Sequence, residues 1–118
     1  MQYLLLIYEE EKVWNALSEA ERGKFHGEYM TFTGEIKSSG HWKGGAPLQP
    51  IHTATTVRVR DGKVSTTDGP FAETREQLGG YYLVEAKDLD EATRLAARIP
   101  GARLGSIEVR PVLPIPPA

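Results

Sequence analysis

Few side chains in this sequence are suited to chemistry, and the clearest are a carboxylate and a histidine from distant segments. Asp68 lies in TTDGPFAETREQLGGYY (residues 66–82), and His26 lies in ERGKFHGEYM (residues 21–30). A His titrates near neutral pH, and a neighbouring carboxylate can orient its ring or accept a proton itself. If folding brings the two side chains together, we predict a proton-transfer pair in which His26 is the base and Asp68 orients it.

Each of these two residues also has a structural interpretation. A turn Asp often accepts a hydrogen bond from the amide two residues on, but Pro70 has no N–H to donate. Asp68 could instead cap the amide of Phe71 or Ala72, and we expect the Phe71 ring to fill the core. His26 would equally suit a half-exposed position with no catalytic role. Both alternatives stay open at this point.

Four further side chains are candidates for ligand binding. Arg75 could hold a carboxylate or phenolate, because a guanidinium binds planar anions in two-pronged fashion. Glu73 lies beside it, and a solvated turn is the alternative for both residues. Tyr29 and Tyr81 are mainly packing residues, as is Tyr82, yet a buried Tyr hydroxyl usually finds a partner, so one of these hydroxyls could face a cavity.

Composition excludes several classes of function. The 118 residues contain no Cys, so thiol catalysis and disulfides are excluded, and a cytoplasmic location is expected. The net charge of −2 gives no basic patch for nucleic acid, and no apolar run approaches the roughly 20 residues of a membrane helix. His41 and His52 are not spaced as metal ligands, so neither a metal nor a cofactor is predicted.

The first half of the chain predicts a strand and a long helix. Residues 3–8 (YLLLIY) form a continuous apolar run, which is typical of a strand buried on both faces. A Ser-x-x-Glu capping box at Ser18 and Glu21 begins a helix that should end at Gly40. Its apolar stripe consists of Phe25, Tyr29, Phe32 and Ile36. A short edge strand is expected at residues 41–43.

The strongest local signal is a hairpin at Asp61-Gly62, a dipeptide typical of two-residue turns. Such a turn fixes the register of both strands. The predicted pairs are Val59 with Val64, Val57 with Thr66, Arg58 with Ser65, Arg60 with Lys63, and Asp68 with Thr55. Asp68 therefore shares a face with the three valines.

The remaining segments predict a strand at residues 80–86, a helix at 88–101 and a strand at 106–112. Asp88 and Glu91 are expected to form the capping box of this helix. The order of elements predicts one α+β domain, residues 1–113, with a ferredoxin-like split βαβ plan and an antiparallel sheet. Residues 114–118 form an extended, Pro-rich tail.

Both helices of this plan cover one face of the sheet, which leaves the other face bare. Residues 3–8 are apolar on both sides of the strand, and a large exposed apolar face is unusual in a monomer. We therefore predict a homodimer in which two sheet faces pack together with a pocket between them.

Several motifs together resemble the DGPF branch of the YCII-related proteins, over nearly the whole chain. They are MQYLLLIYEEE, LSEAER, the stretch from TATTVRVRDGKVSTTDGPF through GGYYLVEAKDLDEA, and GSIEVRPV. The resemblance implies a dimeric α/β barrel. The wider family includes a ring-dehydrochlorinating enzyme for which a His–Asp pair is proposed, and DGPF proteins are often associated with extracytoplasmic-function sigma factors.

These associations imply different kinds of function. We expect a small-molecule enzyme or binder of the dimeric α/β-barrel type. If it is an enzyme, the expected reaction is proton abstraction and elimination, such as loss of halide from a hydroxylated ring. A non-catalytic regulatory partner of a sigma factor is the alternative, and a module that sequesters a small aromatic compound or acid is a third possibility. An enzyme requires His26 and a carboxylate within hydrogen-bonding reach, whereas a partner protein requires an exposed apolar patch outside the dimer seam.

Overall fold

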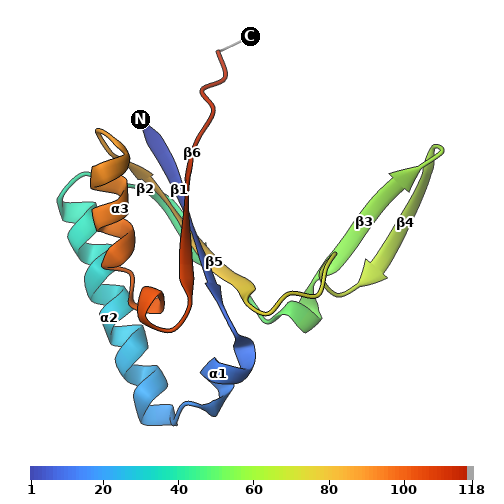
Figure 1. Cartoon of the computed structure of the whole chain (residues 1–118), viewed down its shortest axis with the longest axis horizontal. Coiled ribbons are helices and arrows are strands. Elements are labelled where there is room, and N and C mark those ends of the chain that lie inside the picture. Colours follow the sequence, from blue (N-terminus) through green and yellow to red (C-terminus); the bar gives the residue numbers. More distant parts are fainter. Residues whose placement is uncertain (117–118) are drawn as a thin grey trace.

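The computed structural model describes residues 1–116 of the chain (Figure 1). In chain order the elements are β1 (Gln2–Glu9), α1 (Glu11–Ala16), α2 (Glu19–Ser38), β2 (Trp42–Pro47), the short 3₁₀ helix η1 (Ile51–Thr53), β3 (Thr55–Arg60), β4 (Lys63–Asp68), β5 (Gln77–Glu85), α3 (Leu89–Ala97), the 3₁₀ helix η2 (Pro100–Arg103) and β6 (Ser106–Pro111). Residues 114–116 of the predicted tail have no regular structure, and residues 117–118 lie outside the described part.

The central sheet has four antiparallel strands in the order β2-β5-β1-β6. Helices α2 and α3 lie on the same side of this sheet (Figure 1). This is the predicted ferredoxin-like α+β fold, with the β3–β4 hairpin inserted between β2 and β5. One chain does not test the predicted dimeric barrel.

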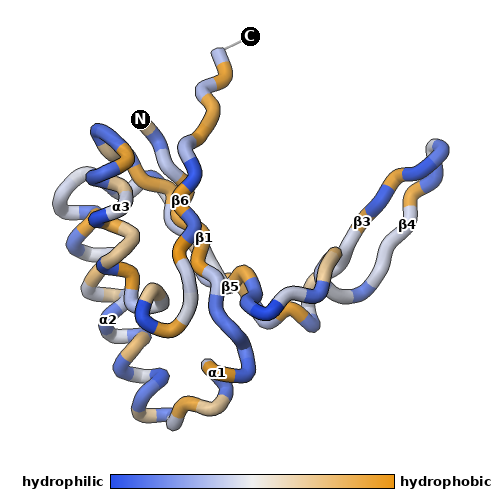
Figure 2. Tube along the Cα trace, viewed as in Figure 1, coloured by the Kyte–Doolittle hydropathy of each residue, from blue (hydrophilic) through white to orange (hydrophobic). Residues whose placement is uncertain are grey.

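Alternate residues of the strands build the core against the two helices. Tyr3, Leu5 and Ile7 of β1 are buried, while the residues between them are only partly covered. The strands of the sheet also contain much of the hydrophobic part of the trace in Figure 2. The other buried hydrophobic residues are Phe32, Ile36, Tyr82, Val84, Ala86, Ala92, Leu95, Ala96 and Ile99.

The predicted capping box begins α2. The Ser18 hydroxyl accepts a hydrogen bond from the Glu21 amide at 3.1 Å, and the Ser18 amide donates to the Glu21 carboxylate at 3.0 Å. Gly40, at φ +81°, follows the C-terminal end of the helix, where an L side chain would be strained. Both predicted helix boundaries therefore agree with the structure.

Helix α3 has only half of its predicted box. Asp88 accepts a hydrogen bond from the Glu91 amide at 2.9 Å, as predicted. The Glu91 carboxylate, however, accepts from the amide of Lys87 at 3.2 Å rather than from that of Asp88. The Glu91 carboxylate therefore bonds to the amide one residue before the predicted one. In this position it also contacts the His41 ring at 3.2 Å.

The β3–β4 hairpin has the predicted register at all five residue pairs. Asp61 (φ 51°) and Gly62 (φ 74°) are both in the left-handed region, which a type I′ turn requires. The hairpin forms a separate two-stranded sheet that projects from the body (Figure 1). Its valine face is therefore exposed.

Phe71, which we expected in the core, is 79% exposed. This expectation is wrong because Phe71 follows the projecting hairpin and does not pack against the core of its own chain.

Four elements of the body differ from the sequence-based expectation. Helix α1 was not predicted, and β2 extends to Pro47 instead of ending at residue 43. Strand β5 begins at Gln77 instead of residue 80, and α3 ends at Ala97 instead of residue 101 and is followed by η2. Long-range contacts hold α1: the Glu11 amide donates to the Gln77 side chain at 2.9 Å, and the Glu11 carboxylate accepts from the Ile51 amide at 2.9 Å. A local pattern does not report contacts of this kind. None of the helices in residues 1–116 has the length and apolarity needed to cross a membrane.

Candidate functional site

A groove of about 770 Å³ lies between α2 and the sheet. Residues of α2 line one side, residues of β1, β2 and β5 line the other, and α1 contributes near the start of α2. The lining residues are Ile7, Glu9, Glu11, Trp14, Asn15, His26, Tyr29, Met30, Thr33, Gly34, Lys37, Trp42, Gly45, Ala46, Pro47, Leu48, Pro50, Gly79, Tyr81 and Tyr82. A groove of this size accommodates a small molecule.

Glycine at position 45 allows the strands and rings of the groove to approach closely. A Cβ atom there would lie 2.8 Å from the Tyr81 carbonyl oxygen and 3.1 Å from the Tyr82 ring. It would also lie 3.2 Å from the Trp42 ring. A side chain at this position would therefore force β2, or the two aromatic rings, to shift.

Aromatic side chains define both ends of the groove. Near its α1 end, the Trp14 ring packs edge-on against His26, with a centroid distance of 5.6 Å. Towards the C-terminal end of α2, Trp42 packs edge-on against Tyr82 at 6.0 Å, and the Lys37 ammonium lies 4.7 Å from the centre of the Trp42 ring. These surfaces suit a flat, partly apolar ligand.

Glu9, the last residue of β1, brings a carboxylate to this groove. It is half-buried, and no hydrogen bond or ion pair within residues 1–116 engages its side-chain oxygens. Partial burial, and to a lesser extent the charge of Glu76, raises the pKa of the Glu9 carboxyl group. The neighbouring Glu11 carboxylate is instead occupied by the Ile51 amide. Glu9 is thus the carboxylate of the groove with the capacity to exchange a proton with a ligand.

Two Tyr hydroxyls accompany Glu9. The Tyr29 hydroxyl accepts a hydrogen bond from the Gly101 amide at 3.1 Å, and the Tyr82 hydroxyl shares one with Thr33 at 2.8 Å. Burial, and then the charge of Glu9, raises the pKa of Tyr29, and burial also raises that of Tyr82. Both phenols therefore keep their protons at neutral pH and can act as hydrogen-bond donors to a ligand.

The predicted catalytic residues lie apart within one chain. His26 lines the groove, but Asp68 is the last residue of β4, exposed and opposite Thr55 in the projecting hairpin. Within the described residues, no hydrogen bond or ion pair joins Asp68 to His26, and none joins Asp68 to the amide of Phe71 or Ala72. The single chain thus forms neither the predicted proton-transfer pair nor the predicted cap.

Of the four predicted ligand-binding residues, two lie at the groove and two lie outside it. Tyr29 and Tyr81 line the groove, whereas Glu73 and Arg75 do not. Arg75 pairs with Glu10 at 2.9 Å, and its side chain is 90% exposed. Glu73 is exposed on the segment that returns from the hairpin. For these two residues the geometry agrees with the alternative of a solvated turn.

Sequence reasoning missed Glu9, Trp14, Thr33 and Trp42 as residues of the groove, whereas Tyr82 was expected to be a packing residue whose hydroxyl could face a cavity. Glu9 did have a signal, since it follows Tyr3, Leu5 and Ile7 at alternate positions and so continues their buried row. An acidic residue at the end of such a row is unusual. Trp14 had none, because α1 has no periodic pattern of its own.

A metal site is not apparent in the described residues. No group of three or more His, Asp or Glu side chains among residues 1–116 comes close enough to hold a metal ion.

The model of the YCII-related domain matches residues 1–116 of the sequence. The chain belongs to this family. A relative from Rhizobium meliloti (strain 1021), the uncharacterized protein R00369, is 37% identical over 114 residues, which cover 95% of this chain and 92% of the relative. Neither comparison addresses the DGPF branch, which remains a prediction from the motifs.

A solved structure shares the fold of this YCII-related protein. It is the 5-chloro-2-hydroxyhydroquinone dehydrochlorinase TftG from Burkholderia phenoliruptrix AC1100, in complex with 2,5-dihydroxybenzoquinone. The TM-score is 0.54 at 15% sequence identity, and the alignment covers 96% of this chain and 94% of that chain. At this identity the likeness shows the fold and does not transfer the activity.

Proposed function

We propose that this YCII-related protein is a small-molecule enzyme that binds a hydroxylated ring in the groove and eliminates halide from it by acid–base chemistry. The observation that carries the proposal is the half-buried carboxyl group of Glu9, which has a raised pKa and no partner in the described residues. A raised pKa brings a carboxyl group closer to neutral pH, where one group can both take and give a proton.

The reaction can be written with Glu9 as the proton carrier. The carboxylate takes a proton from one ring hydroxyl and returns it to the ring carbon that bears the halogen, which turns that hydroxyl into a carbonyl. Glu9, again a carboxylate, then takes the proton of a second hydroxyl while the halide leaves with the carbon–halogen bonding pair. The net change is loss of one hydrogen halide and formation of a quinone, with no oxidant required.

The rest of the groove supports this assignment. Trp42 and Tyr82 offer ring faces and edges on which a flat substrate can lie, and the Tyr29 hydroxyl offers a neutral donor to a developing carbonyl oxygen. His26 lines the groove beside Trp14 and is the second candidate base. Glu9 ranks first because a half-buried, unpaired carboxylate is less easily explained by folding alone than an exposed His.

The fold shared with a dehydrochlorinase that holds a dihydroxybenzoquinone makes hydroxylated rings the first compounds to test. Binding of 2,5-dihydroxybenzoquinone is measured by calorimetry, and halide release from chlorinated hydroquinones by ion chromatography. Wild type is compared with Glu9→Gln and with Glu73→Gln, which makes the same chemical change on an exposed residue outside the groove. We expect Glu9→Gln to lower halide release at least about a hundredfold, the typical contribution of a general acid or base, and Glu73→Gln to leave it unchanged.

Two results would overturn this proposal. One is halide release by Glu9→Gln at the wild-type rate. The other is the absence of both binding and turnover with all tested rings in a wild-type protein that is folded by circular dichroism.

A regulatory partner of a sigma factor is the second candidate function. The observation that favours it is exposed apolar surface away from the sheet, above all Phe71 beside the hairpin. Co-purification of wild type and Phe71→Ser with co-expressed extracytoplasmic-function sigma factors tests it. This candidate requires capture by wild type and loss of capture in the variant, and fails if both proteins behave alike.

A further inference from the structure

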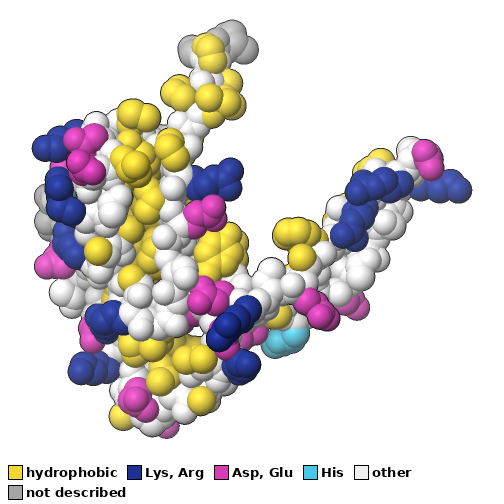
Figure 3. Space-filling model, viewed as in Figure 1, with side chains coloured by type: hydrophobic (Ala, Val, Ile, Leu, Met, Phe, Trp, Pro, Cys, Tyr) yellow, Lys and Arg dark blue, Asp and Glu magenta, His cyan; other side chains and the backbone are white. Residues whose placement is uncertain are grey.

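The β3–β4 hairpin, called the arm below (residues 55–68), lacks the support that such a structure needs. Its two strands pair only with each other, and 13 of its 14 residues are exposed. An isolated two-stranded hairpin is at best marginally stable in water. In Figure 3 the arm stands clear of the body and carries hydrophobic side chains beside a row of Lys and Arg side chains. This arrangement indicates that the arm packs against something outside its own chain.

The two faces of the arm differ in character. Val57, Val59 and Val64 form one face and are 59%, 56% and 70% exposed. The other face carries Arg58 opposite Ser65 and Arg60 opposite Lys63. Like charges placed opposite each other require solvent, so the charged face is suited to water and the valine face to burial.

A second apolar surface of the same chain is partly exposed to solvent. Leu4 and Leu6 of β1 and Leu83 of β5 lie on the sheet face away from the helices, and all three are partly exposed. Leu4 and Leu83 are direct cross-strand neighbours, so these side chains form one continuous patch. The arm projects away from this sheet and does not cover it in its own chain (Figure 1).

The overall dimensions indicate a subunit of an assembly. The radius of gyration is 16.3 Å, and the principal extents are 47 × 47 × 19 Å. A compact domain of this length has a radius of gyration of about 13.5 Å. A second copy of the chain would bring an identical arm and an identical sheet face, which a two-fold interface can match to each other.

We propose that the arm packs its valine face against a second copy of this chain, within a two-fold interface that also covers the Leu4–Leu6–Leu83 sheet face. The interface is self-complementary, since each copy supplies one arm and receives another. It extends the homodimer expected from the bare sheet by assigning a role to the hairpin. It does not depend on the reaction proposed for the groove.

Two triple variants of the arm test this interface. Val57→Thr, Val59→Thr and Val64→Thr together keep the β-branched shape and remove apolar contact. The matched control changes Arg58, Arg60 and Lys63 to Thr on the opposite face of the same strands. Molar mass is measured by light scattering after size exclusion over a wide range of protein concentration. We expect a wild-type dimer, a dimer dissociation constant at least about tenfold higher in the valine variant, and a smaller change in the control.

Hydrogen exchange supplies a second readout that does not depend on the variants folding. If the arm is buried in the dimer, the amides of residues 57–64 in wild type exchange more slowly as protein concentration rises. A monomeric wild type at all concentrations overturns the proposal. So does a dimer whose arm amides exchange at a concentration-independent rate, and so does an unchanged dissociation constant in the valine variant.

Discussion

The Tyr29 hydroxyl accepts a hydrogen bond from the Gly101 amide at 3.1 Å, and this bond joins the middle of α2 to η2 beside the groove. A Cβ atom on Gly101 would lie 2.6 Å from the Tyr29 hydroxyl oxygen and 3.1 Å from the Ile7 side chain. The same atom would lie 3.8 Å from a Glu9 carboxylate oxygen. Close packing at Gly101 therefore fixes the Tyr29 phenol next to the proposed proton carrier.

The first prediction follows from this packing. Gly101→Ala should destabilise the protein by about 1–3 kcal/mol, because an added methyl group must displace Tyr29 or Ile7. In a domain of this length, each kcal/mol lost from the unfolding free energy lowers the midpoint of thermal unfolding by roughly 4 °C. We also expect weaker ligand binding in the groove, since Tyr29 would leave its position. A midpoint equal to that of wild type would show that the site accommodates a methyl group and does not hold Tyr29 rigidly.

Gly23→Ala is the matched glycine substitution, and we expect it to stabilise the protein where Gly101→Ala destabilises it. Gly23 lies in α2, and a Cβ atom there would meet nothing within 4 Å. Alanine in a helix is favoured over glycine by about 0.5–1 kcal/mol, chiefly because the unfolded chain loses freedom. The expected increase in midpoint is about 2–4 °C. Destabilisation instead would indicate that the surface of α2 around Gly23 is covered in the assembled protein.

The pH dependence of Glu9→Gln tests the electrostatic environment of the groove. Burial raises the folded-state pKa of Glu9 above its unfolded value, so the folded state binds the extra proton more tightly. This contribution stabilises wild type below the unfolded pKa and is lost as pH rises through the folded pKa. Relative to wild type, Glu9→Gln should therefore gain stability between acid and neutral pH.

Urea unfolding of both proteins at several pH values measures this difference. Glu73→Gln serves as the control, because Glu73 is exposed. We expect its unfolding free energy to follow that of wild type at every pH. Parallel curves for Glu9→Gln as well would contradict a raised Glu9 pKa and would remove the main support for Glu9 as a proton carrier.

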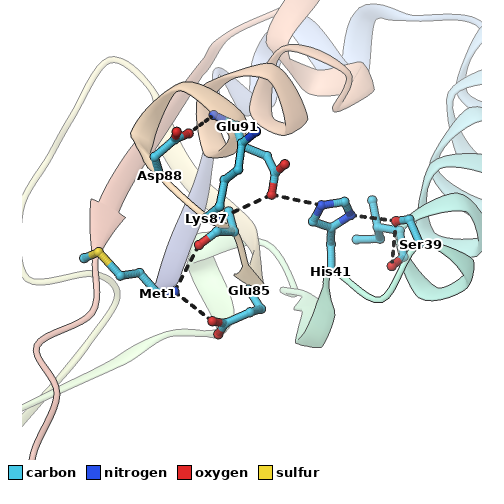
Figure 4. Close-up of polar contacts among 9 residues, drawn as sticks. Met1, Ser39, His41, Glu85, Lys87, Asp88 and Glu91 are labelled. Atoms are coloured by element: carbon cyan, nitrogen blue, oxygen red, sulfur yellow. Dashed lines mark hydrogen bonds and ion pairs between the residues drawn. The ribbon is translucent and has the colours of Figure 1, made fainter.

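A polar network outside the groove supplies another pH-dependent prediction (Figure 4). His41 contacts the Ser39 hydroxyl at 2.6 Å and the Glu91 carboxylate at 3.2 Å, which links the end of α2 to the start of α3. The Lys87 amide, and then His41, lowers the pKa of Glu91. A lowered carboxyl pKa contributes stability above the unfolded pKa that is lost as pH falls through the folded pKa.

Glu91→Gln should therefore lower the midpoint of thermal unfolding slightly at neutral pH, and the deficit should shrink in acid. The decrease should be smaller than that of Gly101→Ala, because the Glu91 side chain is partly exposed and solvent screens its charge. Ser39→Ala is a useful companion because it removes a neighbour of the same ring and leaves the charge of Glu91 in place. If the midpoint of Glu91→Gln falls further below that of wild type as the pH is lowered, the predicted direction of the Glu91 pKa shift is wrong.

The sequence predicted those parts of the fold that short-range patterns determine. Asp61-Gly62 fixed the register of the arm, and the Ser18–Glu21 box gave the start of α2, because both depend on bonds between near neighbours. The order of elements then limited the sheet to a ferredoxin-like plan. These predictions needed no knowledge of distant contacts.

The candidate site was less predictable because tertiary contacts assemble it. Trp14 reaches His26 only because α1 is tied to Gln77 and Ile51, which lie far away in sequence. Phe71 was misplaced because hydrophobicity indicates burial without saying against which chain. Glu9 was the exception, since alternation along β1 already placed it on the helix-facing side.

Asp68→Asn provides the last prediction and a direct test of the His26–Asp68 pair. In one chain Asp68 lies at the end of β4, is exposed and does not line the groove. We therefore expect the variant to bind 2,5-dihydroxybenzoquinone within about twofold of wild type, the usual size of the effect of an exposed substitution outside a site. Glu9→Gln, measured in parallel, should change both the affinity and its pH dependence. If Asp68→Asn abolishes binding while its thermal midpoint equals that of wild type, Asp68 does belong to a site. Because the arm projects from its own body, that site would have to be completed by a second copy. Mixed dimers of Asp68→Asn and Glu9→Gln subunits would then recover binding at one of their two sites, because that site would contain the intact Glu9 of one copy and the intact Asp68 of the other.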